Sequence, residues 1–476
     1  MALAHGTQPR KIRSAPWQNW LAAESRTRRF VLATLIYCVC VVVFAAVAGP
    51  ERLFHHTQFN HYALLADAWL HGRQDLVNGP PAYTMNNDFV AYQGKTFISF
   101  PPLPALLMLP FVKLAGTPEA FDDGQFMVWL AGIAPASLFL VLERLRRSER
   151  SCRSEVENVI LSLLFAFGSV YFFTAVEGTV WFAALVVGAA LSALFVLSAL
   201  DATSPLFAGI AIGCAYLSRP DIILASILFG AEALRVSLTG AFPTEGSLPI
   251  RLRETWRRLD MLAFLRRCGV FLVPIAVAFG VVAWLNLERY DKLTPIYFDH
   301  ELLTVAWRAR MAKWGMVGYH YVAKNMGVAL TSLPWVAPRD SADAFGAPFK
   351  INEHGLALWF TTPLYLWVLW PKKLEEAPAR AWLYAIVSLA ALGPILFDLA
   401  YQNSGWRQFG YRFSNDYAVF LFVLLAIGGR SMRSLFAAAA IWSVAWNAFG
   451  AVTFDRTQFD RFYFRDGSQT IVYQPD

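Results

Sequence analysis

The sequence predicts an all-α polytopic integral membrane protein, with about 11 transmembrane helices and one helix lying parallel to the membrane. Hydrophobic residues make up 57% of the chain and charged residues 16%, against about 25% charged residues in an ordinary soluble domain. Long apolar runs recur between Phe30 and Gly450. Because unpaired backbone groups cannot face lipid, repeated runs of this length indicate helices that span a bilayer.

The basic residues predict the orientation of these helices. The N-terminal segment 1–29 carries "RKIRS" and "RTRR", and the positive-inside rule places it in the cytoplasm. The run "FVLATLIYCVCVVVFAAVAG" then forms an uncleaved first span, since it is longer than the apolar core of a secretory signal peptide. We expect a transmembrane domain over residues 30–452 in the cytoplasmic (inner) membrane. Its outer loops lie at about 50–125, 287–354 and 401–416, and residues 453–476 form an external tail.

The segment "FPPLPALLMLPFVKLAG", Phe100 to Gly116, is the exception among the apolar runs. It contains four prolines and falls short of the roughly 20 residues that a spanning helix needs. If it crossed, the following basic segment "ERLRRSERSCR" would lie outside, against the positive-inside rule. We therefore expect this segment to lie along or dip into the outer membrane face.

The first outer loop contains the first candidate site residues. Its stretch "FNHYALLADAWLHG" reads as an amphipathic helix that ends at Gly72, with Asn60, Asp67 and His71 on one stripe and His61 beside it. This polar stripe either lines a cleft at the membrane surface or faces water from an interfacial helix. The next stretch, "NNDFVAYQGKTF", predicts a small hairpin. Asp88 opens this hairpin, as a base at the mouth of the cleft or as an ordinary turn residue.

A basic residue interrupts a later apolar region. "SPLFAGIAIGCAYLSRPDIILASILFGAEALRVS" predicts two short helices that meet at Arg219 and Pro220, where proline breaks the helix. A charge at such a depth is costly and requires a partner, and Asp221 is one candidate. Arg219 is either functional or a structural, snorkelling arginine.

Cations gather in the other outer loops. "WRARMAKWGMVGYHYVAKNMG" contains Arg308, and "SGWRQFGYRFSND" contains Arg407 and Arg412. Such residues contact anionic lipid headgroups or bind a lipid phosphate, to which the planar guanidinium can donate two hydrogen bonds. The five cysteines form no CxxC or Cys/His cluster, so neither a disulfide framework nor a zinc site is predicted. The net charge of +7 reflects topology, and no nucleic acid partner is expected.

With these motifs, the chain resembles the GT-C superfamily of membrane glycosyltransferases over roughly residues 30–430. It is most similar to bacterial relatives of the protein mannosyltransferase and lipid A aminoarabinose transferase group. The matching elements are "GKTFISFPPLPALLMLP", "AGIAIGCAYLSRPDIIL", "NLERYDKLTPIYF" and "FGYRFSNDYAVFLFVLLA". In the family, an acidic residue precedes a tyrosine early in the first outer loop. Here Gln58, Phe59, Asn60 and His61 precede Tyr62, and none is acidic.

The resemblance implies a glycosyltransferase that moves a sugar from a polyprenyl-phosphate-linked donor on the outer face of the membrane. Its acceptor is an unknown glycan, lipid or protein. In place of the missing acid, the candidate catalytic residues are Asp88, Asp67 and His61. The candidate substrate-binding residues are Asn60, Tyr62, Lys95, Arg219, Arg308, Arg407 and Arg412. No metal is required, although Asp67 and Asp88 can hold a divalent cation.

Two other functions remain open at this point. A transporter or flippase of a lipid-linked or polar substrate also uses broken helices, but it places polar residues at the middle of several spans. The third alternative is a non-catalytic assembly or sensing protein of the membrane, which the missing acid near Tyr62 favours.

Overall fold

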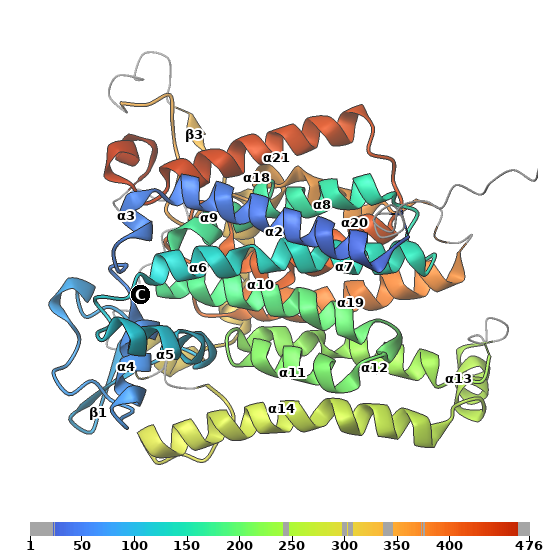
Figure 1. Ribbon diagram of the computed structural model, residues 1–476, viewed down its shortest axis with the longest axis horizontal. Helices are drawn as coiled ribbons and strands as arrows, with labels where there is room; N and C mark the ends of the chain where they lie inside the picture. The colour runs from blue at the N-terminus through green and yellow to red at the C-terminus, as the bar shows by residue number, and fades with distance from the viewer. Residues whose placement is uncertain are drawn as a thin grey trace, which may run out of the picture.

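The chain folds into a bundle of long helices whose axes run side by side (Figure 1). The computed structural model describes residues 22, 24–240, 247–297, 302, 308–336, 346–372, 374 and 377–464. Most of the predicted cytoplasmic N-terminus and half of the predicted external tail, residues 465–476, lie outside the described residues.

Six helical segments among the described residues are long and apolar enough to cross a membrane. They are α2 (Arg26–Ala48), α6 and α7 together (Asp123–Ala131 and Ile133–Arg147), α10 (Val180–Ala199) with the short η2 (Leu200–Ala202), α14 (Met261–Tyr290), α19 (Pro378–Ala400) and α21 (Ser434–Thr453). A seventh span is possible from α8 (Glu155–Phe167) and α9 (Tyr171–Glu177), which meet at an angle of 55°. The multi-pass character is confirmed, whereas the count of about 11 is not.

The difference in count comes from apolar segments that are short or broken. These segments are α11 (Pro205–Tyr216), η3 (Pro220–Ser226), α12 (Ile227–Val236), α18 (Leu358–Thr361), η7 (Pro363–Leu369) and α20 (Asn415–Ile427). Proline has no N–H to donate and clashes with the preceding turn. Accordingly, Pro220 and Pro363 each begin a 3₁₀ helix instead of continuing an α-helix. The predicted break at Arg219 and Pro220 is confirmed.

Local signals in the sequence set several helix ends. Ser154 and Glu157 form a capping box at the start of α8: the Ser154 hydroxyl accepts from the Glu157 amide, and the Glu157 carboxylate accepts from the Ser154 amide. Pro205 occupies the first position of α11, where its missing N–H has no cost. Asp260 caps α14 by accepting from the amide of Ala263.

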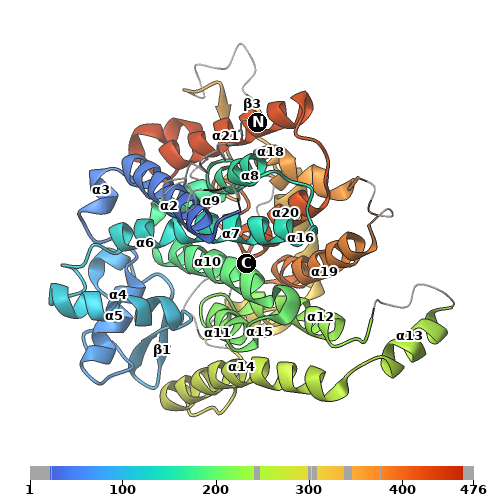
Figure 2. The ribbon, with the colours of Figure 1, turned by 45° about the vertical axis from the view of Figure 1, so that its right-hand side comes forward.

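The predicted first outer loop gathers at one end of the bundle, on the left of Figures 1 and 2. It comprises α3 (Pro50–Leu53), α4 (His61–Leu70), η1 (Ala82–Thr84), β1 (Phe89–Tyr92), β2 (Lys95–Ile98) and α5 (Leu103–Ala115). The predicted hairpin is confirmed, with Phe89 opposite Ile98 and Tyr92 opposite Lys95. The proline-rich segment forms α5, which is too short to be a candidate span and packs against α4. Its orientation to the membrane plane stays a prediction.

Smaller elements complete the chain. They are α13 (Leu248–Arg257), α15 (Arg308–Trp314), η5 (Tyr319–Tyr321), α16 (Val322–Thr331), β3 (Trp335–Val336), β4 (Phe349–Lys350), η9 (Arg412–Ser414) and η10 (Thr457–Phe462). The strands β3 and β4 pair antiparallel.

The core lies around α10 and α20, where 15 of 20 and 12 of 13 residues are buried. The outer helices α2, α14 and α21 instead expose large apolar side chains such as Leu35, Leu272 and Ile441, as expected of surfaces that face lipid. Helix α11 packs closely on α14 because Gly209 and Gly213 leave room for the α14 backbone.

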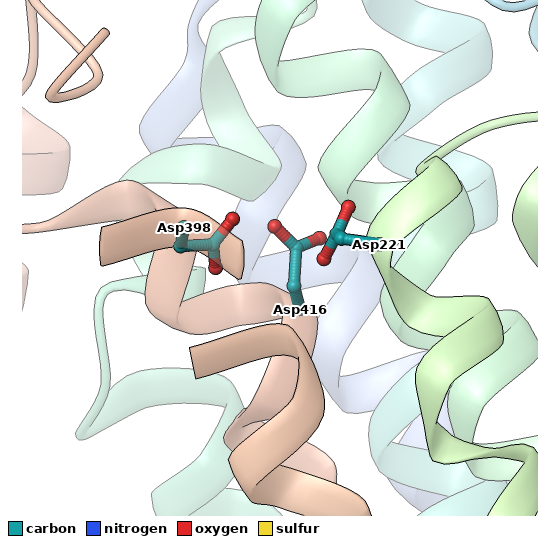
Figure 3. Close-up of side chains that lie close together, drawn as sticks. All are labelled: Asp221, Asp398 and Asp416. Atoms are coloured by element: carbon teal, nitrogen blue, oxygen red, sulfur yellow. The ribbon is translucent and has the colours of Figure 1, made fainter. Parts of the chain in front are cut away.

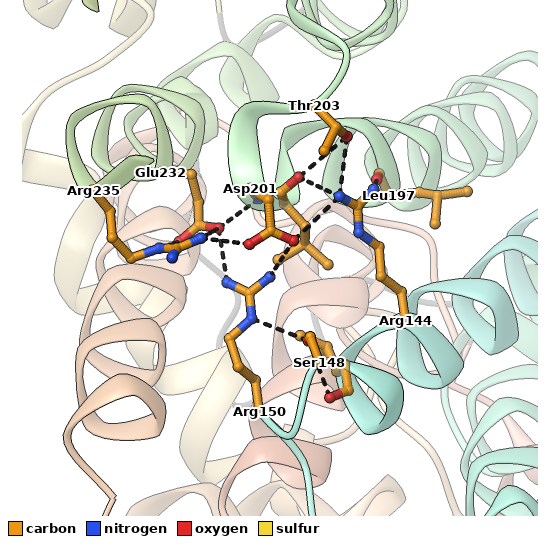
Figure 4. Close-up of polar contacts among 10 residues, drawn as sticks. Arg144, Ser148, Arg150, Leu197, Asp201, Thr203, Glu232 and Arg235 are labelled. Atoms are coloured by element: carbon orange, nitrogen blue, oxygen red, sulfur yellow. Dashed lines mark hydrogen bonds and ion pairs between the residues drawn. The ribbon is translucent and has the colours of Figure 1, made fainter. Parts of the chain in front are cut away.

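An ion-pair network ties α7, η2 and α12 together at the opposite end of the bundle (Figure 4). Arg150 donates to Glu232 at 2.8 Å and to Asp201 at 2.9 Å, and Arg235 pairs with the same two carboxylates. Arg144 donates to two backbone carbonyls at the end of the α10–η2 segment, each at 2.7 Å. Every charged group in this network has a partner, so we interpret the network as structural, holding these helix ends together.

Candidate active site

A cavity of about 640 Å³ opens where α10, α11 and α19 approach η3 and η9. Its wall is mainly apolar and aromatic, with Trp181, Phe279 and Phe413 among its side chains. The polar groups on the wall are Asp88, Ser218, Arg219, Asp221, Asp398, Gln402, Asn403 and Arg412. A mostly apolar cavity with a few convergent polar groups is the usual form of a ligand site.

The helix break places Arg219 in this cavity. Helix α11 ends at Tyr216 and η3 starts at Pro220, so Arg219 has an extended backbone between them. Its guanidinium donates two hydrogen bonds to the carboxylate of Asp416, one of them from Nε to Oδ1 at 2.9 Å. The anticipated partner, Asp221, is farther away, with 3.7 Å between Arg219 Nε and Asp221 Oδ1.

Three buried carboxylates surround Arg219. Asp221 comes from η3, Asp398 from the end of α19 and Asp416 from the start of α20. Their exposed fractions are 2%, 2% and 1%, and one oxygen of each lies within 4.8 Å of the others. Figure 3 shows the carboxyl groups of Asp398 and Asp221 on either side of that of Asp416. Asp221 and Asp398 also line the cavity.

A second cation, Arg412, lies on the wall of the same cavity. Its guanidinium packs over the rings of Phe182, with 5.1 Å to the centroid, and Phe413, with 5.7 Å. Arg219 packs over the same Phe413 ring at 5.1 Å, so this phenyl ring holds both cations. Among the described residues, no carboxylate lies within ion-pair distance of Arg412. Burial and the charge of Arg219 lower the pKa of Arg412 to about 9.

Asp88 is the sequence-predicted carboxylate that reaches the cavity. It stands directly before β1 with a positive φ of 62°. Its Oδ2 accepts a hydrogen bond of 2.8 Å from the indole N–H of Trp181, at the start of α10. The indole therefore fixes the orientation of this carboxylate on the cavity wall.

Asn60, His61 and Tyr62 are buried and do not belong to the described lining of the cavity. His61 donates from Nε2 to the carbonyl of Asn87 at 2.8 Å, and its ring stacks on Phe89. This burial lowers the pKa of His61. Asn60 donates to the carbonyl of Pro118 at 3.3 Å. Burial raises the pKa of Tyr62, while the charge of Arg219 acts in the opposite direction.

Four other predicted site residues do not belong to the described lining of the cavity. The Asp67 carboxylate lies 3.5 Å from the ring of His71, the residue that caps the end of α4. Arg407 pairs with Asp455 at 2.6 Å, and both side chains are more than two-fifths exposed. The remaining two, Lys95 and Arg308, are exposed to solvent.

Asp398, Asp416 and Trp181 were not predicted as site residues from the sequence. Asp398 interrupts the apolar run "LGPILFDLAY", and an ionisable residue within such a run was the signal that could have found it. Asp416 stands at the start of the last buried helix. Trp181 follows the turn "EGTV" and has no distinguishing mark in the sequence.

Comparison with solved structures finds similar chains. ArnT from Cupriavidus metallidurans, bound to undecaprenyl phosphate, is 12% identical with a TM-score of 0.43, over 87% of this chain and 62% of that one. AglB, the oligosaccharyltransferase of Archaeoglobus fulgidus, in complex with an inhibitory peptide and a dolichol-phosphate, is 12% identical with a TM-score of 0.42, over 87% and 56%. An oligosaccharyltransferase of A. fulgidus tethered with an acceptor peptide has a TM-score of 0.44 at 12% identity, over 91% of this chain and 56% of that one.

ArnT and AglB are members of the GT-C superfamily, the superfamily that the sequence motifs resemble. The chain spans about three-fifths of the length of these structures. No family model matches the sequence, and a search of curated proteins finds no match.

Proposed function

We propose that this protein is a GT-C-type glycosyltransferase that uses a polyprenyl-phosphate-linked sugar. It transfers the sugar to an acceptor glycan, lipid or protein on the outer face of the cytoplasmic membrane. The observation that carries the proposal is Arg412, a buried guanidinium on the wall of a largely apolar cavity. A buried cation with no described carboxylate within ion-pair distance gains free energy when an anion arrives.

The phosphate of the donor is the anion that fits this wall. When the bond between the anomeric carbon and the phosphate oxygen breaks, negative charge grows on the leaving phosphate. Arg412 is held in place by Phe182 and Phe413 before the reaction starts. Such preorganised cations stabilise developing charge without having to reorganise. Arg219 packs over the same Phe413 ring and assists, although its main partner is Asp416.

Asp88 is the base that we favour. The acceptor hydroxyl attacks the anomeric carbon, and its proton passes to a carboxylate while the phosphate leaves with the bonding electrons. Asp88 lines the cavity and lies close enough to Arg412 for the two charges to interact. His61 and Asp67, the other candidates from the sequence, are absent from the described lining.

The apolar wall supplies a path for the prenyl chain. Leu224 of η3 lines the cavity and is 47% exposed. Phe279 of α14 and Phe397 of α19 also line the cavity. A prenyl chain can therefore pass from the membrane into the cavity while its phosphate reaches the two arginines.

The test is deletion of the gene in its host, followed by mass spectrometry of the cell-surface glycans and glycolipids. Complementation uses the wild type, Asp88→Asn, Arg412→Gln and the matched control Arg407→Gln, each at wild-type abundance. We expect deletion to remove one defined sugar mass. We expect Asp88→Asn to restore little of it, since general-base catalysis contributes about 10²–10⁴-fold. Arg407→Gln should restore it fully, because Arg407 pairs with Asp455 away from the cavity.

Two outcomes would contradict the proposal. If deletion leaves every glycan unchanged in a host with no second gene of this kind, the protein is not the transferase proposed. If Arg412→Gln and Asp88→Asn both restore the wild-type profile, the cavity is not the reaction site.

A further inference from the structure

We propose that Asp221, Asp398 and Asp416 form a binding site for a divalent cation with oxygen ligands, of the Ca²⁺ or Mn²⁺ kind. The sequence reading required no metal and named Asp67 and Asp88 as the carboxylates able to hold one. The structure instead brings together three carboxylates from η3, α19 and α20, which are far apart in the sequence.

The spacing of the three carboxylates suits such an ion. One oxygen of each lies within 4.8 Å of the other two. Two ligands on opposite sides of a Ca²⁺ ion are about 4.6–5.2 Å apart, because each Ca–O bond measures about 2.3–2.6 Å. Carboxylates are the ligands that hard divalent cations prefer, so both the chemistry and the separation agree.

Two carboxylate oxygens in the group have no partner within the described part of the chain. They are Oδ2 of Asp221 and Oδ2 of Asp398, and both residues are 2% exposed. Leaving an ionised carboxylate oxygen buried without a partner is costly. A cation between these oxygens removes that cost.

An orphaned hydroxyl near the cluster points to the same place independently. Tyr411 is 1% exposed, and its hydroxyl has no hydrogen-bond partner among the described residues. The ring of Tyr411 packs against that of Phe413, with 6.0 Å between the centroids, and Arg219, the partner of Asp416, packs over the same Phe413 ring. A hydroxyl or a water held by it is a suitable further oxygen ligand.

An ion can enter the site from the cavity, and all three carboxylates are able to bind it. Asp221 and Asp398 line the cavity, so an ion can reach them from the cavity. Asp416 lies behind them and already accepts two hydrogen bonds from Arg219. Each of its oxygens has a second lone pair, so Asp416 can bind Arg219 and the ion together.

The balance of charge explains why an ion would be retained. Among the described residues, only the guanidinium of Arg219 lies within 4.0 Å of the three carboxylates, so this group carries two net negative charges. A divalent cation neutralises them. This binding does not rest on the proposed function.

The test is cation binding by the full-length protein purified in detergent micelles. Tb³⁺, a luminescent substitute for Ca²⁺, is excited through nearby aromatic side chains such as Trp181 on the cavity wall. We expect one saturable site whose luminescence Ca²⁺ or Mn²⁺ displaces. Asp398→Asn and Asp221→Asn should each weaken binding tenfold or more, while Asp67→Asn should leave it unchanged, because Asp67 is absent from the described lining of the cavity.

A second measurement guards against variants that fail to fold. Ca²⁺ or Mn²⁺ should raise the thermal unfolding temperature of the wild type, because a ligand that binds only the folded state stabilises it. The proposal is overturned if the wild type shows neither saturable binding nor a thermal shift at millimolar cation. It is equally overturned if Asp67→Asn abolishes the signal while both cluster variants retain it.

Discussion

Replacing Arg219 by methionine should destabilise the protein severely. Arg219 is the only cation within 4.0 Å of the three buried carboxylates among the described residues. It makes two hydrogen bonds to Asp416, and its guanidinium lies 3.7 Å from Asp221 and 3.9 Å from Asp398. Methionine keeps much of the length and the apolar stem but removes the charge.

The expected magnitude follows from the burial of the partners. Removing one partner of a buried ion pair costs about 3–5 kcal/mol, because the other charge stays buried and uncompensated. Asp416 has no exposed side-chain surface, so the upper part of this range applies. The carboxylates of Arg219→Met must take up protons to stay buried. The loss should therefore shrink as pH falls from 7 to about 4, near the ordinary pKa of aspartate.

The assay is denaturant unfolding in detergent micelles, followed by tryptophan fluorescence. The matched control is Arg407→Met, whose ion pair with Asp455 is exposed and should cost no more than about 1 kcal/mol. A double-mutant cycle with Asp416→Asn should show a coupling of about 1–3 kcal/mol, since both changes affect one interaction. A loss below about 1 kcal/mol for Arg219→Met, or a strictly additive cycle, would refute this reasoning.

The remaining predictions concern packing, pH and catalysis. Gly209→Ala should destabilise the protein by about 1–3 kcal/mol, because its methyl group would collide with a backbone carbonyl of α14. Gly230→Ala, in open space on α12, should be neutral or stabilising by up to about 1 kcal/mol. Thermal unfolding of the two variants tests this difference. Burial lowers the pKa of His354 from 6.5 to about 4, so its contribution to stability is complete above pH 6.5 and is lost as pH falls to about 4. That contribution is about 3 kcal/mol at most, and the pH dependence of unfolding should be flatter in His354→Gln. Trp181→Phe should slow sugar transfer about tenfold or more by removing the hydrogen bond to Asp88; the glycan profile at equal protein abundance measures this, and an unchanged profile would contradict it.

The features that depend on local sequence were predictable. Apolar runs and basic segments predicted a membrane protein. Pro220 predicted the helix break that positions Arg219. The "YQGK" turn gave the hairpin that follows Asp88. Each of these depends on neighbouring residues, because propensity, proline geometry and turn chemistry act over a few positions.

The contacts between distant segments were not predictable. The partner of Arg219 is 197 residues away at Asp416, and the nearer candidate, Asp221, was only an approximate choice. His61 stands on the predicted helix, but aromatic neighbours bury its ring. The number of membrane crossings was difficult to predict because several apolar segments are short or broken. A helix must have about 20 residues to span the membrane, and η3 and η7 are shorter than that.

The measurement that tests the proposed site most directly is binding of a short prenyl phosphate to the purified protein. Farnesyl phosphate is titrated into the wild type, Arg412→Gln and Arg407→Gln, with farnesol as the uncharged reference, and tryptophan fluorescence follows binding. If the cavity binds a lipid phosphate at Arg412, farnesyl phosphate binds the wild type more tightly than farnesol does. Arg412→Gln then loses about tenfold or more in affinity, and Arg407→Gln retains it. Equal affinity of the wild type and Arg412→Gln for farnesyl phosphate would contradict the proposed donor site.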